Sequence, residues 1–122
     1  MKTLYLLLPA ILAGCAQNTN DEYANIDFRN EMRSFVTHIS EYAKNNVDDF
    51  IIIPQNGQEL ITDSGEGDGI PESAYLQTID ATGRESMFYG YYNDDEETPS
   101  AENQHLLDLC LTCVEHNVPV LA

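Results

Sequence analysis

One stretch of the sequence decides the predicted fold: Phe50-Ile51-Ile52-Ile53-Pro54-Gln55-Asn56-Gly57-Gln58-Glu59. Its first four residues are large and apolar, which is the pattern of a strand that is covered on both faces. Pro54 has no backbone N–H to donate to a sheet, so the strand is expected to end there. The polar side chains of Gln55, Asn56 and Glu59 follow, and in α/β folds ligands bind at this edge of the sheet.

Helical periodicity precedes this strand. From about Ile26 to Asn46 the apolar residues recur at spacings of three and four, which predicts one stripe of an amphipathic helix: Phe28, Met32, Phe35, Val36, Ile39, Tyr42 and Ala43. Asn25 or Asp27 can cap the start of this helix, and Asn45-Asn46 mark its end.

A polar, glycine-rich segment follows the strand, from Thr62 to Gly69. A calcium loop needs oxygen ligands at alternate positions and a bidentate glutamate at its end, whereas glycines hold the alternate positions counted from Asp63. We therefore expect a surface loop and no metal site here. Pro71-Glu72 then open a short helix that runs through Leu76.

Two assignments are open for the residues from Ile79 to Tyr92. By propensity the aromatic run Met87–Tyr92 is the strand, because aromatic residues are enriched in strands. The other assignment places a short strand at about Thr78 to Thr82 and leaves the aromatic run as an ordered loop. The sequence pattern does not decide between them.

The last predicted helix begins at Thr98-Pro99, the cap and the first helical position, and ends at Asn117. Five apolar residues are expected to form its buried face: Leu106, Leu107, Cys110, Leu111 and Val114. Val118 to Leu121 then start another strand. The order helix, strand, helix, strand, helix, strand implies an α/β structure with parallel strands and right-handed crossovers.

The N-terminal residues have the pattern of an export signal. Lys2 supplies a positive start, Leu4 to Leu12 form an apolar run too short to span a membrane, and Leu12-Ala13-Gly14-Cys15 is a cleavage site. Because this site resembles the bacterial lipobox, we expect residues 1–14 to be removed and Cys15 to carry a lipid. Residues 15–25 would be a flexible tether and 26–122 the folded domain. Ala16, in place of aspartate, favours the outer membrane in a cell that has one.

Composition limits the size of the fold and the class of partner. The chain of 122 residues is long enough for one modest domain, but a complete eight-stranded β/α barrel needs roughly 250 residues. Its 21 acidic and 5 basic residues give a net charge of −16. Nucleic acid and anionic membrane surfaces are therefore excluded as favoured partners, and cationic or neutral partners are preferred.

Cys110 and Cys113 form a Cys-x-x-Cys pattern, for which a disulfide or redox role has to be weighed in an exported protein. Redox pairs normally lie at a helix start, where the helix dipole lowers the thiol pKa, whereas these cysteines lie well inside a helix. We therefore expect buried small apolar residues. The three histidines have no spacing that makes a zinc site, and no cofactor is predicted.

Several segments together resemble one family: Met32-Arg33-Ser34-Phe35-Val36, Phe50 to Gly57, Glu59-Leu60, and Ile79-Asp80-Ala81-Thr82-Gly83-Arg84-Glu85-Ser86-Met87-Phe88-Tyr89-Gly90-Tyr91. In order and spacing they resemble the bacterial and archaeal proteins related to endo-α-1,4-polygalactosaminidase. These proteins are similar to glycoside hydrolase family 114, a β/α barrel family that acts on galactosamine-containing polysaccharide. The resemblance covers most of the chain from Phe28 to Ala122.

The resemblance implies a partial TIM barrel. Phe50 to Ile53 would be about the fifth barrel strand, the strand near Thr78 to Thr82 the sixth, and Val118 to Leu121 the seventh. Glu85 would then lie at the carboxyl end of the sixth strand, where barrel enzymes place catalytic groups. This alignment favours the strand near Thr78 over the aromatic run.

The resemblance also implies a sugar-binding role for Gln55 and Asn56, whose amides can donate to and accept from hydroxyls. The alternative is that both are turn residues that satisfy backbone groups. Tyr89 and Tyr91 could stack on sugar rings, although aromatic residues near a strand end are more often part of the core.

Glycosidases of the usual kind need two carboxyl groups that flank the scissile bond. In the family the partner aspartate follows a strand that would precede the helix starting near Asp27, and this sequence has no counterpart of it. Three explanations are open: a mis-joined gene product, a half-barrel completed by another chain, or a protein that no longer acts. We expect polysaccharide as the partner and no hydrolysis by this chain alone. The alternative function is a non-catalytic surface lipoprotein that binds carbohydrate or a protein.

Overall fold

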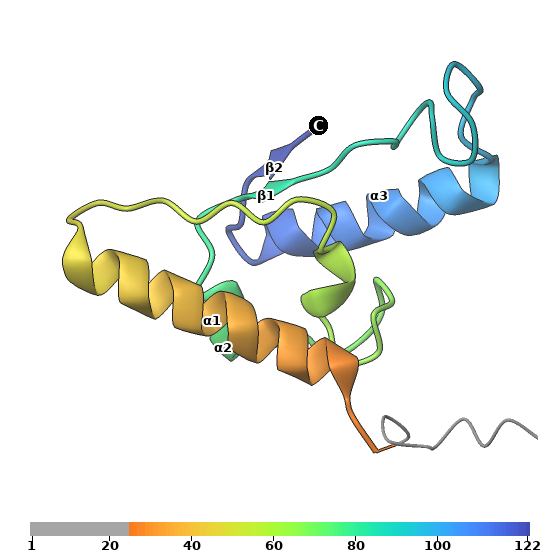
Figure 1. Ribbon diagram of the computed structural model, residues 1–122. Helices are drawn as coiled ribbons and strands as arrows, with labels where there is room; N and C mark the ends of the chain where they lie inside the picture. The colour runs from red at the N-terminus through yellow and green to blue at the C-terminus, as the bar shows by residue number, and fades with distance from the viewer. Residues whose placement is uncertain (1–24) are drawn as a thin grey trace, which may run out of the picture.

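The computed structural model describes residues 25–122 (Figure 1). The predicted signal peptide, Cys15 and the tether up to residue 24 lie outside the described residues. The elements in chain order are α1 (Phe28–Asn46), the 3-10 turn η1 (Gln58–Leu60), α2 (Ser73–Leu76), β1 (Thr82–Gly83), α3 (Ser100–Glu115) and β2 (Val120–Leu121). Within residues 25–122, every helix is too short or too polar to cross a membrane.

The helix α1 closely follows its predicted bounds. Of the two predicted caps Asp27 is confirmed, since its side chain accepts a hydrogen bond from the backbone N–H of Asn30 at 3.0 Å. The helix ends at Asn46, as the Asn45-Asn46 pair predicts, and Val47 turns into extended chain. Local sequence signals are therefore sufficient to place both ends of α1.

The sheet of the described residues consists of β1 and β2, which pair in parallel with Thr82 opposite Val120 and Gly83 opposite Leu121. The sequence left two positions open for the strand between Ile79 and Tyr92. The structure has it at Thr82–Gly83, at the end of the Thr78 to Thr82 assignment. The aromatic run is a loop that makes one isolated antiparallel bridge, between Tyr89 and Glu97. The predicted last strand is present as its final residues, Val120–Leu121.

The prediction of a partial TIM barrel is wrong for residues 25–122. Two strands of two residues each do not make the three consecutive barrel strands that the prediction required. Phe50–Ile53, predicted to be a strand buried on both faces, is extended chain outside any strand, and Ile51 is 63% exposed.

A side chain and a proline explain why this segment does not become a strand. The N–H of Ile52 donates to the side-chain Oδ2 of Asp80 at 2.8 Å rather than to a neighbouring backbone carbonyl. Pro54 has no N–H to give. The segment still lies beside residues 80–83 through the backbone N–H of Asp80, which donates to Ile52, and that of Gly83, which donates to Pro54. These bonds hold the chain without forming a continuous ladder.

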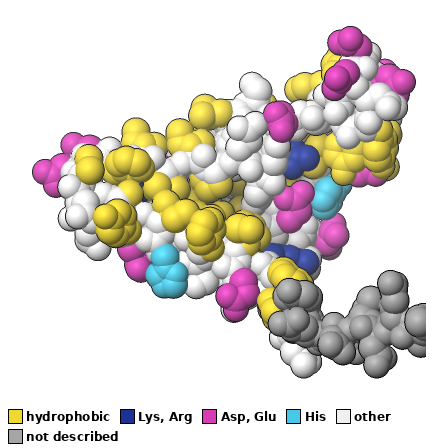
Figure 2. All heavy atoms as spheres, viewed as in Figure 1, with side chains coloured by type: hydrophobic (Ala, Val, Ile, Leu, Met, Phe, Trp, Pro, Cys, Tyr) yellow, Lys and Arg dark blue, Asp and Glu magenta, His cyan; other side chains and the backbone are white. Residues whose placement is uncertain are grey.

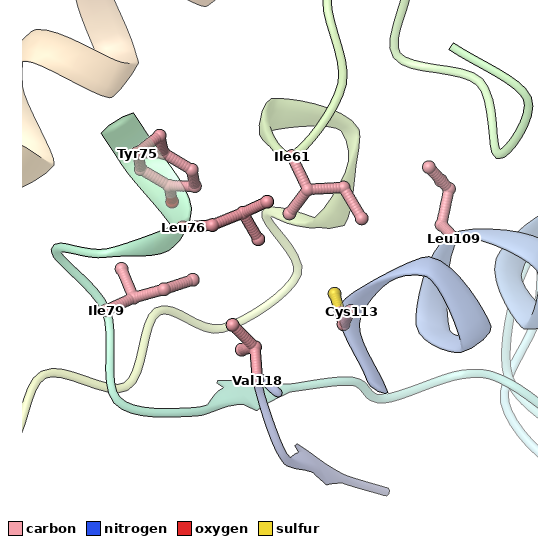
Figure 3. Packing of buried hydrophobic residues seen from close by; sticks show 7 residues of the cluster. All are labelled: Ile61, Tyr75, Leu76, Ile79, Leu109, Cys113 and Val118. Carbon is pink, nitrogen blue, oxygen red and sulfur yellow. The ribbon is translucent and has the colours of Figure 1, made fainter. Parts of the chain in front are cut away.

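The core is small and lies between η1, α2, α3 and the strand pair. Figure 3 shows its seven side chains converging from these elements: Ile61, Tyr75, Leu76, Ile79, Leu109, Cys113 and Val118. Leu109 and Cys113 of α3 have no exposed surface, and Ile61 has 1%. Val36, Ile52, Leu60 and Val120 pack against this cluster from outside. Burial of about seven large side chains is the main apolar stabilisation of the described fold.

The predicted buried face of α3 is correct for two of its five residues. Leu106 and Cys110 are buried, but Leu107, Leu111 and Val114 are 37%, 50% and 56% exposed. Leu109, Thr112 and Cys113 are buried in their place. Thr112 can be buried because its single hydroxyl hydrogen is shared between the carbonyl oxygens of Gly67 and Asp108, each 3.0 Å from Oγ1.

The helix α1 faces the rest of the molecule with polar side chains. Arg33 is 8% exposed and donates to the carbonyl oxygens of Leu60 (2.7 Å) and Thr62 (2.5 Å). Ser40 is 2% exposed and donates to the carbonyl oxygen of Thr78 at 2.6 Å. Because α1 and α3 both contact η1 and lie on either side of it (Figure 1), these polar bonds join α1 to the core.

The apolar side of α1 is exposed instead. We call four of its residues the apolar stripe, with exposed fractions of 49%, 60%, 43% and 75%: Met32, Phe35, Ile39 and Tyr42. Figure 2 shows apolar side chains gathered over α1 and the extended chain that follows it. An amphipathic helix normally buries this side. Here the hydrogen bonds of the polar side determine which face of α1 turns inward.

Candidate functional site

Two of the predicted site residues, Asn56 and Glu85, meet at one edge of the molecule. The backbone N–H of Asn56 donates to the carbonyl oxygen of Gly83 at 2.9 Å, and Gln55 and Gly83 form an isolated parallel bridge. The chain after Pro54 therefore runs beside the chain after β1. Because these two segments run side by side, the side chains of Asn56 and Glu85 come together although they are 29 positions apart in the sequence.

A pair of hydrogen bonds joins these two residues. The side-chain Nδ2 of Asn56 donates to Oε1 of Glu85 at 2.6 Å, and the backbone N–H of Glu85 donates to Oδ1 of Asn56 at 3.1 Å. The backbone of Asn56 has φ 55°, a left-handed conformation that asparagine adopts more readily than most residues. Both side chains are exposed. The Glu85 carboxylate is thus held in place while remaining open to a ligand.

A buried glutamine lies beneath this pair. Gln58 is 1% exposed, and its Nε2 donates to the hydroxyl of Thr82 and to the carbonyl oxygen of Gly83, both at 2.9 Å. The Thr82 hydroxyl in turn donates to the carbonyl oxygen of Pro54 at 3.2 Å. These bonds tie η1 to β1 and to the extended chain, and so position the residues that carry Asn56 and Glu85.

Arg84 completes the network on the inner side. Its Nη1 donates to Oε1 of Gln58 at 3.2 Å and lies 3.7 Å from a carboxylate oxygen of Glu59. The Arg84 side chain is only 8% exposed, and its Nε has no hydrogen-bond partner among residues 25–122. A buried guanidinium with one N–H that makes no hydrogen bond destabilises the fold, since this donor has lost its hydration without gaining a partner. Arg84 pairs with Glu59 here, not with the adjacent Glu85.

Sequence reasoning missed Gln58 and Arg84. Arg84 lies in the Gly-Arg-Glu segment that the family resemblance singles out, whereas Gln58 lies between two of its segments, Phe50 to Gly57 and Glu59-Leu60. Neither was assigned a role at the site. A polar residue one position from a predicted turn is usually solvated, and only the course of β1 beside η1 makes Gln58 a buried contact. The sequence therefore has no signal for either role.

Gln55 and Asn56 line a shallow hollow of about 320 Å³. The other residues around it are Met32, Val36, Pro54, Gly57, Glu59 and Leu60. One side of the hollow therefore carries amide and carboxylate groups, and the other carries apolar side chains of α1 and η1. Concave sites that mix an apolar wall with a few polar groups are typical of small-ligand binding.

Neither of the two predicted tyrosines lines this hollow. Tyr89 is 63% exposed and lines a separate hollow with Phe88, Thr98 and Asn103. Tyr91 packs edge to face on Tyr92, with ring centroids 4.8 Å apart. Burial and the Glu102 carboxylate raise the pKa of Tyr91, and Arg84 opposes this rise. Tyr91 is therefore within electrostatic range of Arg84, whereas no contact connects Tyr89 to the hollow of Gln55 and Asn56 in the described part of the chain.

Cys110 and Cys113 are buried and not joined in a disulfide, in agreement with their predicted role as small apolar residues. Burial raises the pKa of both thiols, that of Cys113 to about 12, with the neighbouring Cys110 adding to the rise. A thiol needs to ionise before it acts as a nucleophile or a redox group. The structure therefore gives no support to a redox function.

Metal-ligating side chains do not cluster in the described residues: within residues 25–122 no group of three or more His, Cys, Asp or Glu side chains is arranged to hold a metal ion. An acidic hollow of about 520 Å³ lies between the Thr62–Gly69 loop and α3. His105 and Glu66 approach within 3.2 Å there. This hollow contains none of the predicted site residues.

Comparison with known proteins identifies one relative whose own function is not stated. An uncharacterized protein, MJ1477, of Methanocaldococcus jannaschii is 35% identical to this chain over 95 residues. The aligned part is 76% of this chain but 25% of the relative, so the chain spans about a quarter of the relative's length. No family model matches the sequence, and no solved structure matches the chain.

Proposed function

We propose that this chain is related to the endo-α-1,4-polygalactosaminidase-like proteins and that its Asn56–Glu85 edge binds galactosamine-containing polysaccharide. The observation that carries the proposal is the pair of hydrogen bonds between these two side chains, at 2.6 Å and 3.1 Å. The family resemblance implies a role at the sugar site for both residues, and they come from separate segments. Their meeting on one exposed edge supports the proposal.

The chemistry of this edge suits an amino sugar. An amide nitrogen has two hydrogens and an amide oxygen two lone pairs, so after bonding to Glu85 the Asn56 side chain keeps one donor and one acceptor. The Glu85 carboxylate can accept from sugar hydroxyls or pair with an ammonium group. The net charge of −16 adds a long-range attraction for a polymer that carries free amines.

The hollow beside this pair, which is lined by Asn56 but not by Glu85, supports the same ligand class. Gln55 adds a second amide to the polar side, and Met32, Val36 and Leu60 provide an apolar wall. A sugar ring has hydroxyl groups around its edge and C–H groups on its faces, so it can use both sides at once. Gln58 and Arg84 lie behind the polar side and keep it in position.

We propose binding without hydrolysis for this chain alone. Hydrolysis of a glycosidic bond needs two carboxyl groups, roughly 5 to 10 Å apart depending on the stereochemical course. The resemblance implies that Glu85 is one of them. We assign no second carboxyl group to the site.

We also propose that the chain is exported and anchored through a lipid on Cys15, with removal of residues 1–14. The support is the sequence pattern of Lys2, the apolar run Leu4–Leu12 and the Leu12-Ala13-Gly14-Cys15 site. Export would place the chain in the cell envelope, where polysaccharide is present. Labelling with radioactive palmitate tests the lipid anchor. We expect the wild-type chain to be labelled and Cys15→Ser to remain unlabelled.

Binding of a partly deacetylated galactosamine polymer tests the sugar site. We expect the wild-type chain to bind it and Glu85→Gln to bind about 10-fold more weakly, the effect of losing one charge-assisted hydrogen bond. Glu41→Gln is the matched control, because Glu41 is an exposed carboxylate on α1 that belongs neither to the Asn56–Glu85 pair nor to the lining of the hollow, and it should bind as wild type does. Equal binding by wild type and Glu85→Gln would contradict the site.

Release of reducing ends from the same polymer tests the non-hydrolytic part of the proposal. We expect no release by wild type or by Glu85→Gln. Release by wild type that disappears in Glu85→Gln would show that the chain is a hydrolase by itself, and the second carboxyl group would then have to be found within it.

A further inference from the structure

The exposed side of α1 continues into the chain that follows the helix. Val47 and Phe50 are 53% and 43% exposed and line, with Phe35, Ile39 and Tyr42, a groove of about 510 Å³ along the second half of α1. We call the apolar stripe together with Val47 and Phe50 the apolar face. This groove shares no residue with the hollow of Gln55 and Asn56, although Met32, at the start of the apolar stripe, also lines that hollow.

The apolar face is too large for an ordinary monomer surface. At about 200 Å² for a fully exposed large side chain, the exposed fractions of its six residues amount to roughly 650 Å². The largest apolar patch on a typical monomer is about 300 to 600 Å², and a standard protein interface buries about 800 Å² on each partner. With the rim residues His38, Ala43 and Asn46 of the same groove, the face approaches the size of one side of a standard interface.

The face cannot be buried by turning α1 on its axis. Arg33, Ser40 and Lys44 bond to carbonyl or carboxylate oxygens of the η1, α2 and β1 region at 2.5 to 3.3 Å. Rotation would break these bonds and leave the carbonyl oxygens of Leu60 and Thr62 unpaired, at a cost for each of about 1 to 3 kcal/mol. The apolar side of α1 therefore stays outward, where another molecule can cover it.

The spacing of the stripe fits another helix. Met32, Phe35, Ile39 and Tyr42 follow each other at intervals of three, four and three residues. This is the a/d spacing of a two-helix seam, in which the side chains of one helix fill the spaces between those of its partner. A helix of 19 residues is about 28 Å long, so the seam extends over most of α1.

We propose that a second copy of this chain covers the apolar face, with α1 packed against α1 of the partner about a twofold axis. A twofold interface uses the same patch on both copies. One patch is therefore sufficient to form a dimer if it is large enough and if the spacing of its side chains lets it pack against an identical patch. Both requirements are met by the roughly 650 Å² of the face and the seam spacing of the stripe.

The charge of the chain predicts how salt acts on this dimer. Two copies that each carry −16 repel each other, and added salt screens that repulsion. The dimer is therefore expected to strengthen as salt is raised from low concentration. A cationic partner on the same face would be attracted at low salt and would bind more weakly as salt is added.

Sedimentation equilibrium of the full chain tests the proposal. We expect a monomer–dimer equilibrium whose dissociation constant rises roughly 100-fold in Phe35→Lys and in Tyr42→Lys, because each substitution enters a twofold interface twice. Ile70→Lys is the matched control: Ile70 is 72% exposed but lies outside the face, and the constant should change less than twofold. Circular dichroism should show the same helix content in all variants, since each replaced residue is exposed.

A single tryptophan gives a second readout, because the chain has none. In Ile39→Trp we expect the emission maximum to move to shorter wavelength as the protein concentration passes the dissociation constant. In Leu111→Trp, at an exposed position of α3, it should stay constant.

Three outcomes would overturn the twofold pairing. One is a monomer at every concentration and salt tested. Another is association that Leu111→Lys weakens as much as Phe35→Lys does, which would indicate an α1 to α3 contact. The third is association that survives Phe35→Lys but is lost in Leu6→Lys/Leu8→Lys, which would assign it to the N-terminal apolar run.

Discussion

The two long helices of this protein use their sequences in opposite ways. α1 has the clearer amphipathic pattern, yet its apolar stripe is exposed and its two buried residues are the polar Arg33 and Ser40. α3 has the weaker pattern, yet its Leu109 and Cys113 have no exposed surface and belong to the core. The difference teaches that periodicity identifies a face of a helix but not the partner that covers it.

The two helices are also held by different forces. α3 is stabilised by burial of apolar area, which is non-directional and scales with the area removed from water. α1 is attached by directional hydrogen bonds from cationic and hydroxyl groups to carbonyl oxygens of η1 and of the chain around it. Substitutions on the two helices should therefore break the fold for different reasons and by different amounts.

The largest effect is expected in the α3 core. Leu109→Ala removes a fully buried side chain and leaves a cavity, and should lower the free energy of unfolding by about 3 kcal/mol. Leu111→Ala, two positions away and 50% exposed, should lower it by less than about 1 kcal/mol. Urea unfolding of dilute protein measures both. Equal losses would mean that α3 is not buried on the side that the structure shows.

The attachment of α1 should give the next largest effect. Arg33→Met keeps an unbranched side chain but leaves the carbonyl oxygens of Leu60 and Thr62 without their donor, and should cost about 2 kcal/mol. Phe35→Ala on the apolar stripe should change the stability of the monomer by about 0.5 kcal/mol or less, because Phe35 is 60% exposed and alanine is the better helix former.

Urea unfolding at one low protein concentration gives the free energy of unfolding of Arg33→Met and of Phe35→Ala, and so compares the polar side of α1 with its apolar stripe. Arg33→Lys is the control, since it keeps a charge but not the planar fork that reaches two carbonyl oxygens, and should recover only part of the loss. A larger loss for Phe35→Ala than for Arg33→Met would show that the apolar stripe, not the polar side, faces the core.

The smallest effect is a pH dependence at the end of α1. The Ile52 N–H and Lys44 hold the pKa of Asp80 below its ordinary value of 3.8. The charged form therefore stabilises the fold above pH 3.8, and this contribution is lost as the pH falls through the lower folded-state pKa. Because the carboxylate is 38% exposed and screened by solvent, we expect only about 0.5 kcal/mol.

Comparison of wild type with Asp80→Asn, from pH 5 down to about pH 2, measures this contribution. Asparagine keeps an acceptor for the Ile52 N–H but does not titrate. Wild type should thus lose about 0.5 kcal/mol more than Asp80→Asn over this range. Parallel stability curves would show that the Lys44–Asp80 contact, at 2.9 Å, does not contribute in solution.

Local signals in the sequence predicted the helices well and the sheet poorly. Asp27 and Asn46 act through bonds or dihedral preferences within a few residues, so their effects are readable from the sequence. At α3 the prediction is off by one residue, because Pro99 is the N-cap in place of Thr98 and the helix begins at Ser100. The predicted strand Phe50–Ile53 depended on neighbours 28 or more positions away, and the Asp80 side chain takes the N–H that a ladder would have used. Four consecutive apolar residues indicate that burial is favourable, but they do not identify the contacts that would provide it.

For the candidate site, the family resemblance placed Asn56 and Glu85 at one edge, and the structure has them hydrogen-bonded there. It also implied a barrel, which the described residues do not form. Gln58 and Arg84 could not be predicted, because a buried amide and a buried guanidinium are recognised by what surrounds them. Their partners come from β1 and η1, which meet only in the folded chain.

The sequence by itself determined the acidity of this protein, the bounds of α1 and the burial of the two cysteines. These depend on composition or on interactions within a few residues. Only the tertiary structure decided which face of α1 turns inward, which face of α3 forms the core and which residues support Asn56 and Glu85. Each of those choices depends on hydrogen-bond and packing partners that lie far away in the sequence.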